Sequence, residues 1–203
     1  MPESNNQDTI NGKKPRVSKA EPIKSLTDVR RIIDNLKKGH PRNRLLFIVG
    51  VNCPLRIGTL LELKVGNVRN LEEGDRFYFD HSDSEKPRNL EINRKVFNAL
   101  RKYLRNEKIQ DDDYLFCGNK PRKPLSKQHA NRLIKEWVKG IGLSGNYGNE
   151  SLRKTFGYIQ RTVYGVGFDV LCDKFNHKTP AQTARLLGVD ENTHVSIILN
   201  KVG

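Results

Sequence analysis

The segment FNHKTPAQTARLLGV, residues Phe175–Val189, lies near the C-terminus of the chain. The sequence in and before it predicts one helix around Phe168–Phe175 and another around Pro180–Leu187. His177 then lies in the connection between the two helices, and a tail follows Gly188. A single histidine in a loop is a weak indication of function, so the stretch gains meaning only from what accompanies it.

Three other charged residues stand where a simple fold does not require them. Arg56 interrupts the apolar stretch VNCPLRIGTLL, and Arg153 starts a helix directly after the glycine-rich connection GLSGNYGN. Lys86 lies at the tip of a predicted hairpin. Taken singly, each is more often a solvated or ion-paired side chain than a functional one.

The rest of the chain predicts a mainly α-helical fold with a small antiparallel β-sheet, an α+β class. Ser25 followed by Asp28 is a variant of the capping box that begins a helix, and Gly39 and Pro41 end that helix. Two short strands, 76–80 and 89–93, flank the polar turn HSDSEKPR, and 114–117 is expected to add a short strand. The other expected helices cover 43–51, 56–64, the segment with Val96 to Leu104, the segment between Ser126 and Gly140, and the segment that contains Arg153.

In combination these segments resemble the catalytic domain of tyrosine recombinases, the phage integrase family. NCPLRIGTLLELKVGNV is similar to the segment with the first active-site arginine, which implies that role for Arg56. The hairpin SEKPRNLEI implies Lys86 as the active-site lysine, with Arg88 as a substitute because the turn register is loose. NESLRKTFGYIQ resembles the family's HxLR segment and implies Arg153 as the second arginine, while FNHKTP implies His177 as the histidine. The resemblance covers residues 25–189.

The chemistry of that family explains these residue types. Two arginines bind the non-bridging oxygens of a DNA phosphate, stay charged at any working pH and stabilise the transition state. The lysine donates a proton to the leaving hydroxyl, and a tyrosine attacks phosphorus to form a 3′-phosphotyrosine. The resemblance implies no cofactor and no metal. It implies contacts with double-stranded DNA from Arg56, Lys86, Arg88, Arg153, Lys154, His177 and Lys178.

Two positions depart from the family pattern. The nucleophilic tyrosine is expected nine residues after His177, where the chain has Leu186, whose side chain has no lone pair to attack phosphorus. Glu150 stands where the HxLR histidine is expected, and its carboxylate can pair with Arg153 or Lys154 and repel a phosphate. The resemblance therefore implies that the chain binds DNA and that its catalytic residues are vestigial.

Three functions remain open. The first is a non-catalytic DNA-binding regulator or accessory factor of a phage or mobile element, cytoplasmic and associated with the nucleoid. The second is an active recombinase or integrase, which requires that Leu186 replaces a natural tyrosine or that another tyrosine acts. Tyr158 and Tyr164 are expected in a core helix, and Tyr147 in the loop before Arg153. The third is a modulator that docks on another copy or on a full-length recombinase through the apolar residues from Val195 to Leu199.

Composition agrees with a polyanionic partner. The 203 residues include 37 Lys and Arg against 23 Asp and Glu, which gives a net charge of +14. No apolar run approaches the ~20 residues that span a bilayer, and the N-terminus lacks the apolar core of a secretory signal. The three cysteines are widely spaced without a CxxC pair, which disfavours a metal site or disulfide framework and fits reduced thiols.

The organisation expected along the chain has three parts. Residues 1–24 are polar and basic and are interpreted as a disordered arm. Residues 25–189 form the recombinase-like domain, and residues 190–203 form a tail that is a candidate for contact between protomers.

Overall fold

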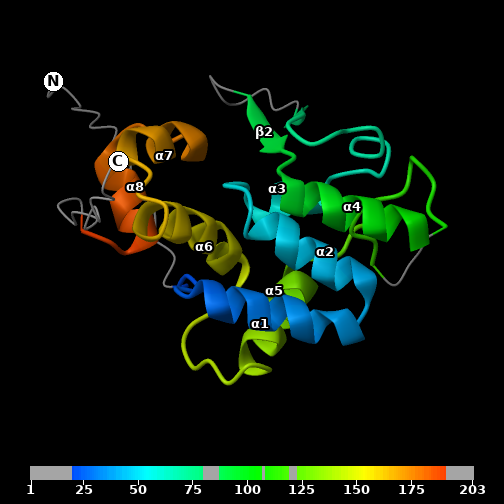
Figure 1. The fold of residues 1–203 in the computed structure, drawn as a ribbon, viewed down its shortest axis with the longest axis horizontal. Helices are drawn as coiled ribbons and strands as arrows, with labels where there is room; N and C mark the ends of the chain where they lie inside the picture. The colour runs from blue at the N-terminus through cyan, green and yellow to red at the C-terminus, as the bar shows by residue number, and fades with distance from the viewer. Residues whose placement is uncertain (1–19, 80–86, 107, 119–122, 191–203) are drawn as a thin grey trace, which may run out of the picture.

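The fold is mainly helical with one small sheet, as the sequence predicts (Figure 1). The computed structural model describes residues 20–79, 87–106, 108–118 and 123–190. The elements in chain order are α1 (Leu26–Asn35), the short 3-10 helix η1 (Leu36–Lys38), α2 (Pro41–Gly50), α3 (Ile57–Leu61), β1 (Arg76–Phe79), β2 (Arg88–Glu91), α4 (Arg94–Asn106), α5 (Lys127–Lys139), α6 (Asn149–Thr162), α7 (Phe168–Phe175) and α8 (Pro180–Leu187).

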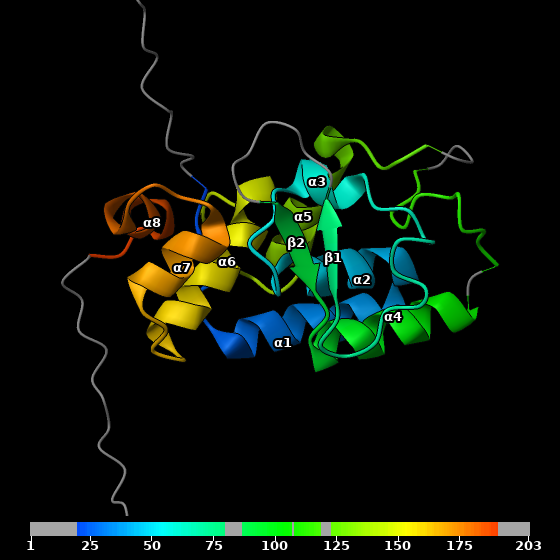
Figure 2. The ribbon, with the colours of Figure 1, turned by 90° about the horizontal axis from the view of Figure 1, so that it is seen from above.

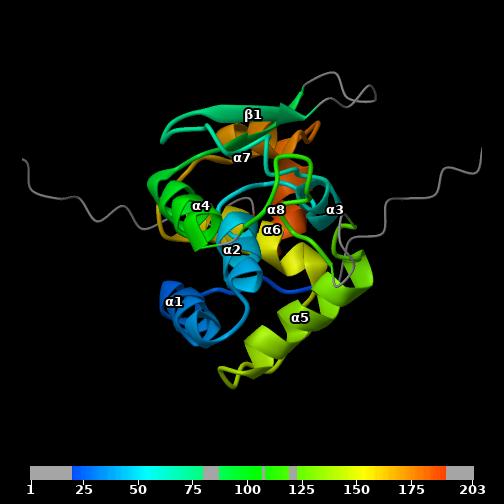
Figure 3. The ribbon, with the colours of Figure 1, turned by 90° about the vertical axis from the view of Figure 1, so that its right-hand side faces the viewer.

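The first helix begins directly after the predicted capping residue, and the second begins at Pro41, two residues before the expected start at 43. The Ser25 hydroxyl accepts hydrogen bonds from the backbone N–H groups of Thr27 and Asp28, which satisfies donors that the helix leaves free. Pro41 begins α2, a position where its missing N–H costs nothing. The α2 residues from Leu45 to Val49 are all buried, because α1, α4 and α6 pack around this helix (Figure 3). This helix is the centre of the main hydrophobic core.

The sheet is a two-stranded antiparallel hairpin. Arg76 pairs with Glu91 at one end, and Phe79 pairs with Arg88 at the other. The expected strand at 114–117 is wrong, because this segment forms only two isolated bridges, from Tyr114 to Lys64 and from Cys117 to Pro124. Its apolar residues, Leu115 and Phe116, are fully buried core side chains, and that burial explains a pattern that otherwise resembles a strand.

Helices α6, α7 and α8 pack together at one end of the molecule (Figure 2). Leu171, Phe175 and Leu187 form a small second core there, separate from the main one. Gly157 of α6 permits the close packing, because a Cβ atom at this position would lie 2.6 Å from Cδ2 of Leu187 and 2.7 Å from Cζ of Phe175. The bounds of α7 and α8 are those that the sequence predicts.

The N-terminal boundary differs from the expected one. Ile23, assigned to a disordered arm, is fully buried, and its backbone N–H donates to Oγ1 of Thr155. The N–H of Glu21 donates to the carbonyl of Asn146. A single isoleucine among polar residues has no periodicity, so the pattern could not reveal this contact. Residues 1–19 of the arm and the tail beyond Asp190, with its apolar run from Val195, lie outside the described residues.

Within the described ranges, no helix has the length and apolar character needed to cross a membrane.

Candidate functional site

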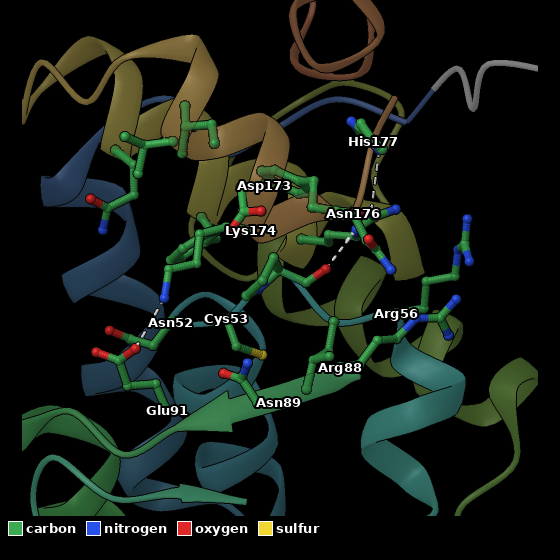
Figure 4. A pocket seen from close by; sticks show the side chains of 18 of the residues that line it. Asn52, Cys53, Arg56, Arg88, Asn89, Glu91, Asp173, Lys174, Asn176 and His177 are labelled. Carbon is green, nitrogen blue, oxygen red and sulfur yellow. Dashed lines mark hydrogen bonds and ion pairs between the residues drawn. The ribbon is translucent and has the colours of Figure 1, made fainter. Parts of the chain in front are cut away.

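A cleft of about 560 Å³ opens between the hairpin, the start of α3, and helices α6 and α7. This volume is within the usual range for ligand sites. Four of the residues singled out from the sequence line it: Arg56, Arg88, Arg153 and His177. Figure 4 shows Arg56 at the start of α3 and Arg88 on β2, on the same side of the pocket. The fold therefore brings together residues that are up to 121 positions apart in the chain.

Arg56 and Arg88 are two accessible arginines of the cleft that lack an ion-pair partner among the described residues. Arg56 is the residue directly before α3, with an extended backbone and an exposed side chain. Arg88 is the first residue of β2 and is half-buried. None of the ion pairs between described residues involves either side chain. Both guanidinium groups can therefore bind an anion without first losing a carboxylate partner.

Arg153 is held rigidly at the base of the cleft. Its side chain is only 7% exposed. Nε donates to the carbonyl of Pro54 at 2.7 Å and Nη2 donates to the carbonyl of Phe175 at 3.2 Å, while the guanidinium lies 4.8 Å from the centre of the Phe175 ring. Burial lowers the pKa of Arg153 to about 10, and nearby Glu150 opposes that shift. The group is still cationic at neutral pH and is fixed before any ligand arrives.

His177 follows the left-handed residue Asn176 that ends α7. Its ring stacks on Phe175 with centroids 5.4 Å apart, and Nδ1 lies 2.9 Å from Oγ1 of Thr183. Nε2 lies 3.5 Å from Nη2 of Arg153. Burial, followed by the charges of Arg153 and Arg56, lowers the pKa of His177 to about 4. The imidazole is therefore neutral at pH 7 and adds hydrogen bonding to the cleft without adding charge.

The other described residues that were predicted to contact DNA do not line the cleft. Lys154, which the sequence predicts to contact DNA, is only 5% exposed and does not line the cleft. Lys178 is exposed and its backbone N–H donates to Gln182, but it does not line the cleft either. Lys86 lies outside the described residues.

The two residues that the sequence predicts to depart from the family pattern, Glu150 and Leu186, lie on α6 and α8. An oxygen of Glu150 lies 3.8 Å from Nη1 of Arg153, the first of the two pairings that the sequence allows. Leu186 is half-buried and packs against the second core of Leu171, Phe175 and Leu187. No tyrosine is among the described residues that line the cleft.

The three tyrosines considered as alternative nucleophiles lie in different parts of the fold. Tyr147 packs against the main core, and Tyr158 is half-buried on α6. Tyr164 was expected in a core helix, and that expectation is wrong: the residue follows the end of α6 and is 62% exposed.

Several lining residues give no signal in the sequence. Lys174 of α7 reaches across to Glu91 of β2, and Arg76 of β1 pairs with the same carboxylate. Their contacts join residues far apart in the chain, which a periodic pattern does not reveal. Cys53 also lines the cleft, but burial raises the pKa of its thiol to about 12, so it is unreactive at neutral pH.

Comparison with known families agrees with this architecture. The model described as "Phage integrase family" matches residues 25–190. The chain belongs to the phage integrase family. The match covers nearly the whole folded domain, including every element from α1 to α8.

Among integrase family proteins, the chain is similar to the probable integrase/recombinase YoeC of Bacillus subtilis, with 34% identity over 85% of this chain and 92% of that protein. It is 28% identical to the tyrosine recombinase XerA of Pyrococcus furiosus over 68% of this chain, and this match spans only 48% of XerA.

Solved structures show the same fold at lower identity. A crystal structure of XerA recombinase superposes with a TM-score of 0.69 at 23% identity, covering 84% of this chain and 62% of that one. XerH recombinase bound to difH substrate gives 0.67 at 19% identity, covering 87% and 52%, and a lambda integrase dimer bound to a COC′ core site gives 0.62 at 17%, covering 94% and 52%. The chain thus spans about half to two thirds of these larger recombinases.

Proposed function

We propose that this integrase family member binds double-stranded DNA in its cleft and does not cleave the strand. One observation carries the proposal: Arg56, Arg88 and Arg153 come from three separate elements to one cleft whose described lining contains no tyrosine. Guanidinium groups suit phosphate oxygens because they donate paired hydrogen bonds and stay charged. The net charge of +14 adds a general attraction for a polyanion.

The absence of cleavage rests on Leu186. In this proposal Leu186 occupies the nucleophile position, nine residues after His177, and its hydrocarbon side chain cannot attack phosphorus. Its packing against the second core gives it a structural role instead. Glu150 beside Arg153 adds a negative charge near the position of the phosphate, which further disfavours a transition state that is itself anionic.

A protein that binds a DNA site without cutting it acts by occupying that site. We therefore propose a regulator or accessory factor of a phage or mobile element, acting in the cytoplasm on nucleoid DNA. Two related structures, XerH bound to difH and lambda integrase bound to a core site, are complexes with DNA, which supports the choice of ligand. Gel-shift titration of mixed-sequence duplexes at low salt tests the proposal, and no binding at micromolar protein would reject it.

A second function, strand transfer, is favoured by one comparison. The Bacillus relative, 34% identical over 92% of its length, is named a probable integrase/recombinase. Strand transfer by this chain would require a nucleophile from outside the described lining of the cleft. A nicked suicide substrate distinguishes the two functions, because it traps a covalent protein–DNA adduct only if a nucleophile acts.

A further inference from the structure

Two further cations converge on one carboxylate oxygen on the side of the cleft away from Arg56. Nζ of Lys174 lies 3.1 Å from Oε2 of Glu91, and Nη2 of Arg76 lies 3.3 Å from the same atom. All three residues line the cleft, and Figure 4 shows Lys174 reaching Glu91 on the opposite side of the pocket from Arg56. One anionic oxygen held by two cations is the arrangement that a phosphate oxygen also adopts.

The contacts of this carboxylate are easily exchanged. The side chains of Arg76, Glu91 and Lys174 are 49%, 46% and 39% exposed, and ion pairs between such exposed groups contribute little to stability. The strand itself is anchored independently, because the neighbours Leu90 and Ile92 are fully buried. The Glu91 side chain can therefore turn away without displacing β2.

We propose that Lys174 and Arg76 form a second phosphate subsite, in which the Glu91 carboxylate takes the place of a phosphate while DNA is absent. The inference rests on the proposed function, because it assigns a second phosphate of the same DNA to the same cleft. Along β2, Arg88 and Glu91 are three residues apart, or about 10 Å in an extended strand. One phosphate group cannot bridge that distance, so the two subsites bind different phosphates of one backbone.

Glu91 then sets the affinity of the cleft for DNA. A ligand that reaches only Arg56 and Arg88 does not compete with Glu91. A polyanion that reaches both sides must displace the carboxylate before it can bind Lys174 and Arg76. The wild-type protein therefore binds DNA more weakly than its cations alone would allow.

The test is a fluorescence anisotropy titration of a mixed-sequence duplex at several KCl concentrations. The combined Lys174→Gln and Arg76→Gln variant should lose one phosphate contact and reduce the slope of log K against log salt by about 0.9. Glu91→Gln should bind roughly threefold to tenfold more tightly, because no ion pair has to be broken. Glu73→Gln is the matched control, since Glu73 pairs with Arg94 at 3.1 Å and neither residue lines the cleft.

The outcomes separate this inference from the proposed function. An unchanged slope in the double variant, or weaker or equal binding by Glu91→Gln, overturns the second subsite. Arg88→Gln in the same titration reports on the side of the cleft that contains Arg56 and Arg88. If Arg88→Gln weakens binding while the double variant does not, only the second subsite fails. If the wild-type protein does not bind the duplex at all, both proposals fail. Thermal midpoints verify that each variant is folded, as expected for exposed side chains.

Discussion

Nη1 of Arg153 lies 3.8 Å from Oε2 of Glu150, three residues earlier on α6. Arg153 is the most deeply buried arginine of the cleft, and this carboxylate opposes the lowering of its pKa that burial causes. The same negative charge would repel a phosphate that approaches Arg153. Glu150 thus stabilises the cation of the DNA-free protein and opposes the ligand that the cation would bind.

Replacement of Glu150 by Gln should separate these two effects. We expect DNA binding to become about twofold to fivefold tighter, because a repulsive charge is removed, while the free energy of unfolding falls by about 1 kcal/mol. Anisotropy titration and urea denaturation measure the two quantities. Glu136→Gln is the control, because its carboxylate also lies 3.8 Å from an arginine, Arg132, but on the exposed surface of α5. Weaker DNA binding by Glu150→Gln would contradict this account.

Arg56→Gln and Arg88→Gln should each weaken DNA binding and reduce the salt dependence of log K by up to about 0.9. Neither side chain has an ion-pair partner among the described residues, so the substitutions should leave the stability nearly unchanged. Arg94→Gln removes an exposed arginine that does not line the cleft and serves as the control. If Arg94→Gln has the same effect as Arg88→Gln, binding reflects total charge and not the cleft.

Stability should decrease as the pH falls from about 6.5 towards 4. The folded protein lowers the pKa of His177 to about 4, chiefly through burial, so the unfolded chain binds the proton more tightly across this window. The loss is on the order of 1 kcal/mol, because the ring is partly exposed. Urea denaturation of the wild type and of His177→Gln at several pH values measures it. The pKa of His129 is lowered as well, again chiefly by burial, so His129→Gln is run in parallel. An equally steep pH dependence in His177→Gln would contradict the assignment.

Leu186→Tyr should give covalent adducts with a nicked suicide substrate if the arginines and His177 still form a working site. Adducts should increase when Glu150→His is added, because a repulsive charge beside Arg153 is then removed. Leu186→Phe is the matched control, since it has the same ring without the hydroxyl. Denaturing electrophoresis detects the adduct. Its appearance in Leu186→Phe would mean that another residue supplies the nucleophile.

Helix ends that depend on local backbone chemistry follow from the sequence. Local sequence pattern predicts α7 and α8 at their observed bounds, and the resemblance to tyrosine recombinases groups Arg56, Arg88, Arg153 and His177, which all line one cleft. Proline, glycine and capping residues mark helix ends through backbone chemistry alone. Helix ends can therefore be predicted without knowledge of the tertiary structure.

Contacts that depend on packing between distant segments do not follow from the sequence. Lys154 follows Arg153 directly, yet only the packing of α6 decides which of the two faces the cleft. Ile23 is buried through a contact 132 residues away, and the pairing of Lys174 with Glu91 joins residues 83 apart. None of these contacts leaves a periodic trace in the sequence.

The most direct test of binding without cleavage is one titration of nicked, mixed-sequence duplex DNA, with each sample analysed by native electrophoresis and again after denaturation in SDS. Binding without cleavage predicts a retarded band in the native gel that disappears completely in SDS. A retarded band that survives SDS, or no retardation at micromolar protein, would contradict it.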